Sequence, residues 1–381
     1  MQPSLTNIHP RQISWTSERS CTTSQPLSNR IASFHDQPGI IGIRRFTTVA
    51  EARQKNSLSV EGALAVRQGR DAFRLILHGD DKRIAVVTGP CSVHDVDAAL
   101  EYAARLKTLS DELGDRLLLM MRVYFEKPRT SVGWKGLVSD PHLDDSNSME
   151  DGVSIARRLL CDIADLGVPS ATEFLDPLIA SYLGDLVSWV AIGARTTESQ
   201  THRQMASGLS APVGFKNCTG GSIDAAVNAI TAARRPHTFP GVDDDGFVSL
   251  IETAGNSDTH VILRGARADG KWKPNYSAAD ISQVEEWLTD AALPCRIMVD
   301  CSHANCGYDF RKQAGVAEHW IAQRLEGNRS VFGLMFESNL HEGRQTLTAR
   351  SQLKYGVSVT DPCIGWAETE DVLRCVHAAA A

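Results

Sequence analysis

The segment Leu117–Met121, which reads Leu-Leu-Leu-Met-Met, runs directly into Arg122-Val-Tyr-Phe-Glu-Lys-Pro-Arg-Thr-Ser-Val-Gly-Trp-Lys135. The uninterrupted apolar run predicts a strand that is buried on both faces of a parallel sheet. The segment behind it carries four cations within fourteen positions. Because like charges at one strand end repel each other unless an anion meets them, this segment indicates a phosphate or carboxylate ligand. A solvated basic loop is the alternative, but the aromatic side chains Tyr124, Phe125 and Trp134 favour a packed loop.

Apolar runs of the same kind recur along the chain and alternate with amphipathic stretches. Eight such strand–helix units predict an α/β fold, a (β/α)8 TIM barrel. A doubly wound sheet is the alternative, but no Gly-x-Gly-x-x-Gly motif follows a predicted strand. The predicted strands are Ile84–Thr88, Leu117–Met121, Pro169–Phe174, Leu186–Ile192, Pro212–Phe215, His260–Leu263, Arg296–Val299 and Val331–Phe336. The predicted helices are Val96–Leu113, Asp151–Leu166, Asp176–Gly184, Ser199–Gly208, Ser222–Arg234, Ala278–Ala292, Phe310–Leu325 and Thr369–Ala379.

The chain outside this repeat predicts three further parts. Residues 1–40 are rich in Ser, Thr, Gln and Asn and predict a disordered tail, with an organellar transit peptide as a weaker alternative. Residues 41–80 predict an N-terminal extension, because Ala50–His78 has helical patterning. Within the barrel, residues 81–381, the segment 237–253 alternates apolar and polar side chains around an Asp-Gly turn, which predicts an inserted β-hairpin.

The composition excludes several classes of protein. A net charge of −7 over 381 residues gives no general attraction to nucleic acid or to an anionic membrane. No apolar run is long enough to span a membrane. The nine cysteines form no Cys-x-x-Cys pair, which favours reduced thiols over a disulfide framework. We therefore expect a cytoplasmic protein with no nucleic-acid or membrane partner.

Catalytic residues of a TIM barrel gather at the carboxyl ends of its strands, and two sets of side chains fall at these positions. The first set is five cations from four predicted strands, whose charge suits a phosphate and a carboxylate bound by bidentate arginine forks. Ion pairs with acids are the structural alternative, but few acids are predicted at the neighbouring strand ends. The five cations are Arg122, Lys127, Arg195, Lys216 and Arg264.

The second set combines one thiol, one imidazole and two carboxylates near predicted strands that become neighbours once the barrel closes. These donors suit one borderline divalent ion such as Mn, Fe, Co or Zn. No His-x-x-x-His or Cys-x-x-Cys spacing marks a metal site, so the prediction rests on their common place at one mouth. Cys301 and Cys306 lie close enough in sequence to be rival ligands. The predicted ligands are Cys91, His303, Glu337 and Asp361.

Five motifs stand at these strand ends: Gly89-Pro-Cys-Ser-Val-His94, Arg122-Val-Tyr-Phe-Glu-Lys-Pro-Arg-Thr130, Gly193-Ala-Arg-Thr-Thr-Glu-Ser199, Gly214-Phe-Lys-Asn217 and Asp300-Cys-Ser-His-Ala-Asn305. Together they resemble class I 3-deoxy-D-arabino-heptulosonate-7-phosphate (DAHP) synthase, in the same order and over about Asp81 to Trp366. The resemblance implies a transferase that condenses phosphoenolpyruvate with erythrose 4-phosphate and water. This reaction is the first step of the shikimate pathway to chorismate and the aromatic amino acids.

The resemblance also implies a role for each set of residues. In that family the residues matching Cys91, His303, Glu337 and Asp361 bind the metal, and those matching the five cations hold phosphoenolpyruvate. The residues matching Lys127, Pro128, Arg129 and Thr130 meet the sugar phosphate. We expect a Lewis acid to stabilise the alkoxide that forms when the enol carbon attacks the aldehyde. Lys127, Lys216 and Glu173 are the predicted catalytic residues, with Glu173 and Lys216 placed to steer a water molecule and a proton.

Two motifs depart from the family pattern, and two other functions compete with it. The usual Lys-Asn-Gly-Thr-Asp-Gly reads Lys216-Asn-Cys-Thr-Gly-Gly221, and the usual Arg-Gly-Gly reads Arg264-Gly-Ala266, which bears on rate and substrate fit. One competitor is the sister enzyme 3-deoxy-manno-octulosonate-8-phosphate synthase, which typically has Ala-Asn where Pro128-Arg129 stand. The other is a catalytically idle barrel that senses a ligand or binds a partner, against which the complete ligand set argues.

The inserted hairpin predicts regulation, because family members with this insertion are usually inhibited by an aromatic amino acid bound between hairpin and barrel flank. Ser210, Phe239 and Gly241 match the effector positions. The phenylalanine-sensing form typically has Ser where Gly241 stands, and Gly leaves room for a phenol hydroxyl, so tyrosine is the favoured effector. A hairpin that only packs or assembles is the alternative. The resemblance also favours a homodimer or homotetramer.

Overall fold

The structure is a computed structural model that describes residues 39–40, 42–129 and 133–380. The chain divides into two units, Met1–Phe46 and Thr47–Ala381, and every helix and strand of the described residues lies in the second unit. Almost all of the predicted tail lies outside the described residues, so its disorder stays a prediction. No helix in the part of the chain that the structure describes is long and apolar enough to cross a membrane.

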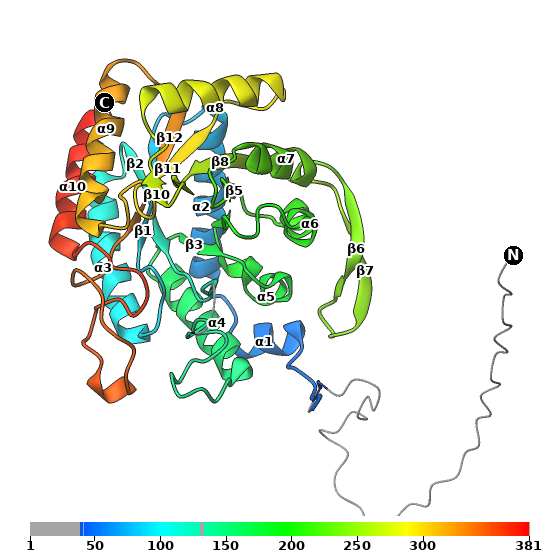
Figure 1. Cartoon of the computed structure of the whole chain (residues 1–381). Coiled ribbons are helices and arrows are strands. Elements are labelled where there is room, and N and C mark those ends of the chain that lie inside the picture. The colour runs from blue at the N-terminus through cyan, green and yellow to red at the C-terminus, as the bar shows by residue number, and fades with distance from the viewer. Residues whose placement is uncertain (1–38, 41, 130–132, 381) are drawn as a thin grey trace, which may run out of the picture. The chain divides into compact units, whose positions relative to one another are not determined.

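Eight parallel strands close into a barrel, which confirms the predicted (β/α)8 fold (Figure 1). Every residue of these strands is buried, as their unbroken apolar runs predict. The doubly wound alternative is excluded, because a doubly wound sheet is open. Around the barrel the order is β1-β12-β11-β8-β5-β4-β3-β2. The strands are β1 (Ile84–Gly89), β2 (Leu117–Arg122), β3 (Ser170–Glu173), β4 (Trp189–Ile192), β5 (Val213–Lys216), β8 (Thr259–Leu263), β11 (Ile297–Asp300) and β12 (Val331–Glu337).

A helix follows each barrel strand and covers its outer face (Figure 1). Local sequence sets several of their starts. Asp95 accepts hydrogen bonds from two backbone N–H groups of the first turn of one helix, and Ser277 forms a capping box with Asp280 in another. The helices are α3 (Val96–Leu113), α4 (Met149–Asp165), α5 (Pro177–Leu183), α6 (Gln200–Gly208), α7 (Asp224–Ala233), α8 (Ala278–Asp290), α9 (Gln313–Leu325) and α10 (Trp366–Ala379). Short 3-10 helices are η1 (Gly184–Leu186), η2 (Phe310–Lys312) and η3 (Arg350–Gln352).

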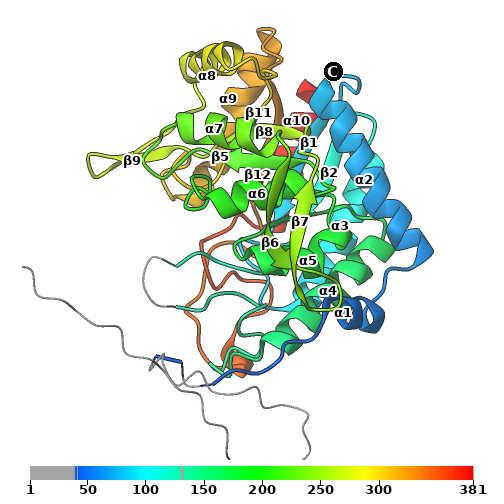
Figure 2. The ribbon, with the colours of Figure 1, turned by 90° about the vertical axis from the view of Figure 1, so that its right-hand side faces the viewer.

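The predicted helical stretch before the barrel is two helices, α1 (Val49–Lys55) and α2 (Val60–His78). The break occurs because Ser59 begins a new helix by accepting a hydrogen bond from the Gly62 N–H. The Phe73 ring of α2 lies 6.0 Å from Trp189 and 5.7 Å from Phe332, residues near the first positions of their strands. The amino-terminal end of the barrel is therefore closed by α2, which Figure 2 shows at the side facing away from β9.

The predicted hairpin is present as β6 (His237–Val242) and β7 (Val248–Thr253), an antiparallel pair. Its turn includes Gly246, whose φ of 85° suits glycine. Its contacts with the neighbouring helices include the Thr253 hydroxyl, 2.6 Å from that of Ser207, and Asp244, which pairs with Arg53 of α1 at 2.6 Å. The hairpin thus stands beside the helical layer as the sequence predicts.

A second hairpin, β9 (Ala266–Ala268) and β10 (Lys271–Lys273), follows β8 and was not predicted. Asp269 and Gly270 form its turn with φ values of 53° and 75°, the positive pair that a type I′ turn requires. Strands of three residues are too short for periodicity to reveal, although the Asp-Gly pair was a usable signal. Figure 2 shows this hairpin projecting from the molecule on the side opposite α2.

Candidate active site

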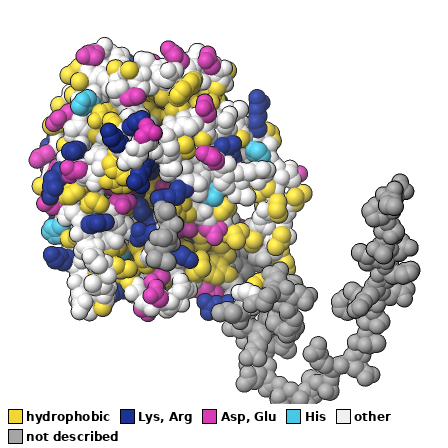
Figure 3. Space-filling view, viewed as in Figure 1, with side chains coloured by type: hydrophobic (Ala, Val, Ile, Leu, Met, Phe, Trp, Pro, Cys, Tyr) yellow, Lys and Arg dark blue, Asp and Glu magenta, His cyan; other side chains and the backbone are white. Residues whose placement is uncertain are grey.

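The carboxyl ends of the strands meet at one mouth of the barrel. Gly89 of β1 pairs with Glu337 of β12, so these two strands end level, and Asp300 of β11 pairs with Met335, two residues before the end of β12. Figure 3 shows Lys and Arg side chains gathered near the middle of this face. A cavity of about 280 Å³, the mouth cavity, opens there. Its lining is Arg122, Lys127, Pro128, Arg129, Glu173, Leu175, Gly193, Ala194, Arg195, Thr196, Lys216, Thr219, Arg264, His303, Tyr308 and Asp361.

All five predicted cations line the mouth cavity, together with the predicted substrate residues Pro128 and Arg129 and with Glu173. Thr130 lies outside the described residues. The expectation that few acids lie near the cations is wrong for at least three of them, since Lys127 lies 4.0 Å from the Asp361 carboxylate and two further cations have closer acids. Arg122 pairs with Glu337 at 2.9 Å and Lys216 pairs with Asp300 at 3.1 Å, because barrel closure brings these strand ends together.

Arg122 is completely buried and held from several sides. Its guanidinium donates to the carbonyl oxygens of Pro90 at 3.1 Å and Cys91 at 3.2 Å, and it lies 3.5 Å from the centroid of the Tyr124 ring. Burial alone would lower the pKa of Arg122, but Tyr124 and Glu337 raise it above its ordinary value. Arg122 therefore presents a fixed, permanent positive charge at the base of the cavity.

Asp300 links two functional side chains, although the sequence motif that contains it predicted no role for it. Its Oδ2 lies 3.1 Å from Lys216 Nζ and 2.9 Å from His303 Nδ1. Burial raises the pKa of Asp300, but His303 and Lys216 more than offset this and hold the pKa well below its usual range. An ionised, fully buried Asp300 therefore fixes both side chains at the mouth. Its strand-end position was the signal available in the sequence, but its pairing with Lys216 joins two segments that lie far apart in the chain.

Lys127 contacts two of the predicted metal ligands, Cys91 and Asp361. Lys127 Nζ lies 3.0 Å from Cys91 Sγ, and 4.0 Å from the Asp361 carboxylate. Burial, with help from the charge of Glu337, raises the pKa of the Cys91 thiol to about 12, although Lys127 acts in the opposite direction. A divalent cation that bound this sulfur would replace its proton.

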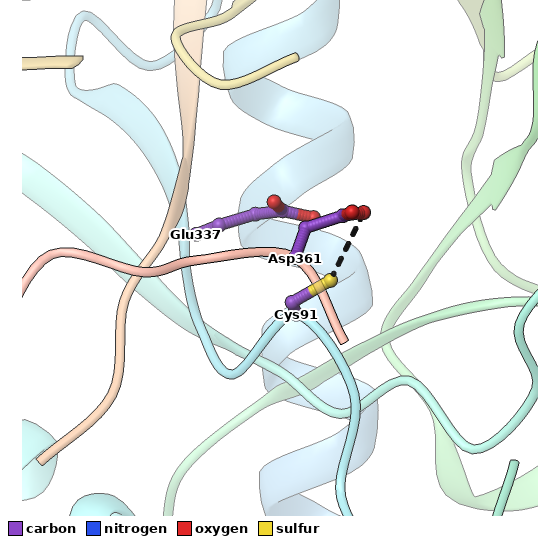
Figure 4. Close-up of side chains that lie close together, drawn as sticks. All are labelled: Cys91, Glu337 and Asp361. Carbon is purple, nitrogen blue, oxygen red and sulfur yellow. Dashed lines mark hydrogen bonds between the residues drawn. The ribbon is translucent and has the colours of Figure 1, made fainter. Parts of the chain in front are cut away.

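Three of the predicted metal ligands point toward one another, as Figure 4 shows. Donor atoms of Cys91, Glu337 and Asp361 all lie within 4.8 Å of one another, and Cys91 Sγ lies 3.5 Å from Asp361 Oδ2. They come from the loop after β1, the end of β12 and the loop after β12. One sulfur and two carboxylate groups in a buried place fit a borderline divalent ion better than calcium or magnesium.

His303 stands next to this group rather than within it. Its Nδ1 faces Asp300, which leaves Nε2 directed at Glu337, 3.7 Å from Oε1. A carboxylate behind a ligand histidine is the usual support for metal binding. The rival ligands point elsewhere: Cys306 Sγ contacts the His303 carbonyl oxygen at 3.3 Å, and Cys301 is fully buried beside Val299. Neither thiol belongs to the group formed by the described acids and Cys91.

The predicted effector residues line a second, larger cavity of about 950 Å³ between the β6–β7 hairpin and the α5 and α6 helices. Ser210, Phe239 and Gly241 all contribute to its wall. A Cβ atom at Gly241 would lie 2.6 Å from Ile251 Cγ1, so a larger residue there would displace Ile251. Charged and polar side chains at the same wall include Arg53, Arg70, Asp185 and Gln204.

The two segments that depart from the family pattern pack against each other. A Cβ atom at Gly221 would lie 2.7 Å from that of Ala266, and the Arg267 N–H donates to the Thr219 carbonyl oxygen at 3.0 Å. The β9–β10 hairpin is therefore tied to the loop that follows Lys216. Both departures therefore lie together at the rim of the mouth.

Comparison with solved structures finds a close match to phospho-2-dehydro-3-deoxyheptonate aldolase from Francisella tularensis SCHU S4. The two share 41% sequence identity with a TM-score of 0.87, over 90% of this chain and 98% of the other. This agreement covers the barrel and most of its additions.

Curated relatives agree with the structural match. The chain is 55% identical over 321 residues to the Tyr-sensitive phospho-2-dehydro-3-deoxyheptonate aldolase of Escherichia coli K12, covering 84% of this chain and 89% of the relative. The Phe-sensitive enzyme of the same organism is 51% identical over 321 residues, covering 84% and 90%. The model of the DAHP synthetase I family matches residues 54–374. The chain therefore belongs to the DAHP synthetase I family, as the motifs at its strand ends indicate.

Proposed function

We propose that this chain is a DAHP synthase whose catalytic site is the mouth cavity. It condenses phosphoenolpyruvate with erythrose 4-phosphate and water to give DAHP and phosphate, the reaction of its family. The observation that carries the placement is the convergence of five cations with the Cys91, Glu337 and Asp361 group at one barrel mouth. A trianionic substrate needs such a cluster, because each oxyanion is bound best by charge-assisted hydrogen bonds.

The buried cations bind and orient phosphoenolpyruvate in this proposal. Arg122 is fixed by two carbonyl oxygens and Glu337, so it loses little conformational freedom when the ligand binds. Lys216, held by Asp300, and Glu173 on the facing wall are placed to direct a water molecule and to hold or release its proton. Lys127, in contact with Cys91 of the ligand group, acts on the oxygen where negative charge develops.

Erythrose 4-phosphate occupies the outer part of the cavity, along the loop after β2. Pro128 and Arg129 line this side, and the Arg129 Nε donates to the Trp134 carbonyl oxygen at 2.8 Å, which turns the guanidinium along the loop. Thr130 is the next residue of the same loop. The sugar phosphate therefore meets a cation other than those assigned to phosphoenolpyruvate.

One divalent ion, of the class Mn, Fe, Co or Zn, is the proposed cofactor, with Cys91, His303, Glu337 and Asp361 as its ligands. When bound, it would supply a Lewis acid for the aldehyde oxygen. The mixed sulfur, nitrogen and oxygen donors favour this class over hard cations. Asp300 supports the proposal, because it would keep His303 oriented toward the other three ligands.

The test is release of inorganic phosphate from phosphoenolpyruvate in the presence of a chosen aldose phosphate. We expect rapid release with erythrose 4-phosphate, slow release with a five-carbon aldose phosphate, and none with phosphoenolpyruvate alone. Faster release with the five-carbon sugar would identify the sister enzyme. No release with either sugar from metal-loaded protein would favour an idle barrel.

Tyrosine is the proposed effector, bound in the cavity beside the β6–β7 hairpin. Relatives named Tyr-, Phe- and Trp-sensitive share this chain's family, and the Tyr-sensitive ones are 55% identical to it. Gly241→Ser would push Ile251 into the cavity and should weaken inhibition by tyrosine. The measurement compares inhibition by equal concentrations of tyrosine, phenylalanine and tryptophan in wild type and variant. Indifference to all three would make the hairpin a packing or assembly element.

We further propose a homodimer or homotetramer in the cytoplasm, with residues 1–40 as a tail and residues 41–80 as an extension of the barrel domain, residues 81–381. The exposed apolar side chains Phe247, Val248 and Leu250 of the hairpin support assembly through this element. Sedimentation of the purified chain would give the oligomeric state.

A further inference from the structure

Tyr308 lines the mouth cavity, but none of the proposed catalytic or binding roles uses it. Its hydroxyl oxygen accepts a hydrogen bond from the Arg264 guanidinium at 2.8 Å. Its ring lies 4.4 Å from the ring of Trp272, on the β9–β10 hairpin. Tyr308 therefore connects a cation of the predicted phosphoenolpyruvate site with the hairpin at the rim.

The backbone around Tyr308 fixes its position. Gly307 and Tyr308 have φ values of 63° and 60°, and the Tyr308 N–H donates to the His303 carbonyl oxygen at 2.8 Å. A non-glycine residue in the left-handed region is unusual and needs support from its surroundings. The loop after β11 thereby directs the tyrosine hydroxyl toward Arg264, at the end of the neighbouring strand β8.

The hairpin supports the other side of the ring. Arg267 lies over the Trp272 ring, with 5.1 Å between its guanidinium carbon and the ring centroid. The same arginine's backbone N–H donates to Thr219, in the loop after β5. The tilted aromatic pair of Trp272 and Tyr308, together with Arg267, thus links the loops after β5, β8 and β11. Aromatic pairs of this kind add stabilisation beyond the area that they bury.

Arg264 differs from Arg122 and Lys216 in the partner that holds it. Those two cations pair with buried acids, whereas no acid among the described residues lies within ion-pair distance of Arg264. Its backbone is fixed by Asn217, whose side-chain oxygen accepts the Arg264 N–H at 2.9 Å. A neutral hydroxyl orients a guanidinium without neutralising it, so the full charge stays available for an anion.

We propose that Tyr308, held by Trp272, is a positioning residue that orients Arg264 for the phosphate group of phosphoenolpyruvate. This inference rests on the proposed function. The β9–β10 hairpin then sets the affinity for one substrate, since loss of its tryptophan would loosen the tyrosine and, through it, the arginine.

The test uses the full-length, metal-loaded enzyme and the variant Tyr308→Phe, which keeps the ring and removes the hydroxyl. We expect the KM for phosphoenolpyruvate to rise about fivefold and the KM for erythrose 4-phosphate to change less than about twofold. Calorimetric binding of phosphoenolpyruvate alone should weaken by the same factor. Trp272→Ala should give a smaller rise of the same kind, and Trp272→Phe should restore most of it.

Tyr355→Phe is the matched control, because Tyr355 is similarly exposed, donates its hydroxyl to Glu101 and lies outside the mouth cavity. Its kinetic constants should match wild type. An unchanged affinity of Tyr308→Phe for phosphoenolpyruvate would overturn the inference. Equal rises in both KM values with a lower unfolding midpoint would also overturn it, since they indicate a structural role. If wild type released no phosphate, the proposed function would fail, and calorimetry would still decide whether Tyr308 affects binding.

Discussion

The two ends of the barrel differ in how their buried polar groups find partners. At the amino-terminal end, His260 is fully buried but has both ring nitrogens satisfied, by the Trp189 indole at 3.0 Å and by the Val261 carbonyl oxygen at 3.0 Å. Phe73 and Phe332 pack around this pair. At the carboxyl end, cations from several strands surround an open cavity, and the Cys91 thiol faces the Asp361 carboxylate beside it.

This difference assigns stability to the closed end of the barrel and function to the open end. At the closed end the polar ring atoms of His260 and Trp189 have hydrogen-bond partners within the chain. The open end gathers charges that a bound anion and a bound cation would satisfy. Substitutions at the two ends should therefore have different effects. Those at the closed end should change the free energy of unfolding, and those at the open end should change the KM values for the substrates.

The largest effect is expected from Phe73→Ala at the closed end. Phe73 is fully buried, so its truncation leaves a cavity and should lower the free energy of unfolding by about 3–5 kcal/mol. Leu75→Ala on the same helix, where the side chain is 48% exposed, should change it by less than about 0.5 kcal/mol. Denaturant unfolding measures both. Altered KM values of the Phe73 variant, at a temperature where it stays folded, would contradict the assignment of this end to stability alone.

A smaller effect, confined to one substrate, is expected from Arg129→Ala at the open end. Loss of a charge-assisted hydrogen bond should raise the KM for erythrose 4-phosphate about tenfold and leave stability unchanged. Lys135→Ala removes an exposed cation of the same loop that does not line the cavity and serves as the control. Steady-state kinetics with each substrate varied would decide. A rise in the KM for phosphoenolpyruvate instead would place Arg129 in the other subsite.

The smallest effect is a pH dependence at the closed end. Burial lowers the pKa of His260 from 6.5 to about 4, so below pH 6.5 the unfolded chain binds a proton that the folded chain does not. Stability is therefore retained above pH 6.5 and lost as the pH falls from 6.5 toward 4. Between pH 7.5 and 5.5 wild type should lose about 1 kcal/mol more than His260→Gln. Equal losses in the two proteins would show that His260 does not titrate differently on unfolding.

Local patterns predicted the barrel and the residues at its mouth well. The predicted strand Leu117–Met121 is β2 with one residue added. It could be predicted because a strand buried on both faces is apolar at every position. The cations at strand ends follow from the same reasoning, because parallel strands must end on one side of the barrel. The hairpin at residues 237–253 was equally visible, through its alternation and its Asp-Gly turn.

What sequence reasoning missed depends on contacts between distant segments. Asp300 was visible at a strand end, but its pairing with Lys216 exists only after the barrel closes. Tyr308 and Trp272 lie on the loops after the neighbouring strands β11 and β8, and no periodic pattern in the sequence indicates that their rings meet. The break between α1 and α2 was missed because Ser59 was not recognised as a new N-cap.

Metal removal and return tests the central claim, that the charged mouth is a metal-dependent catalytic site, most directly. The full chain is depleted by a chelator, supplied with both substrates, and titrated with Mn²⁺ while phosphate is measured. We predict no turnover before the titration and full recovery near one ion per chain. Cys306→Ala should recover in the same way, and Cys91→Ala should stay at least about 10³-fold slower, because a metal ligand is lost. Full activity of metal-free protein, or recovery of Cys91→Ala to the level of Cys306→Ala, would contradict the account.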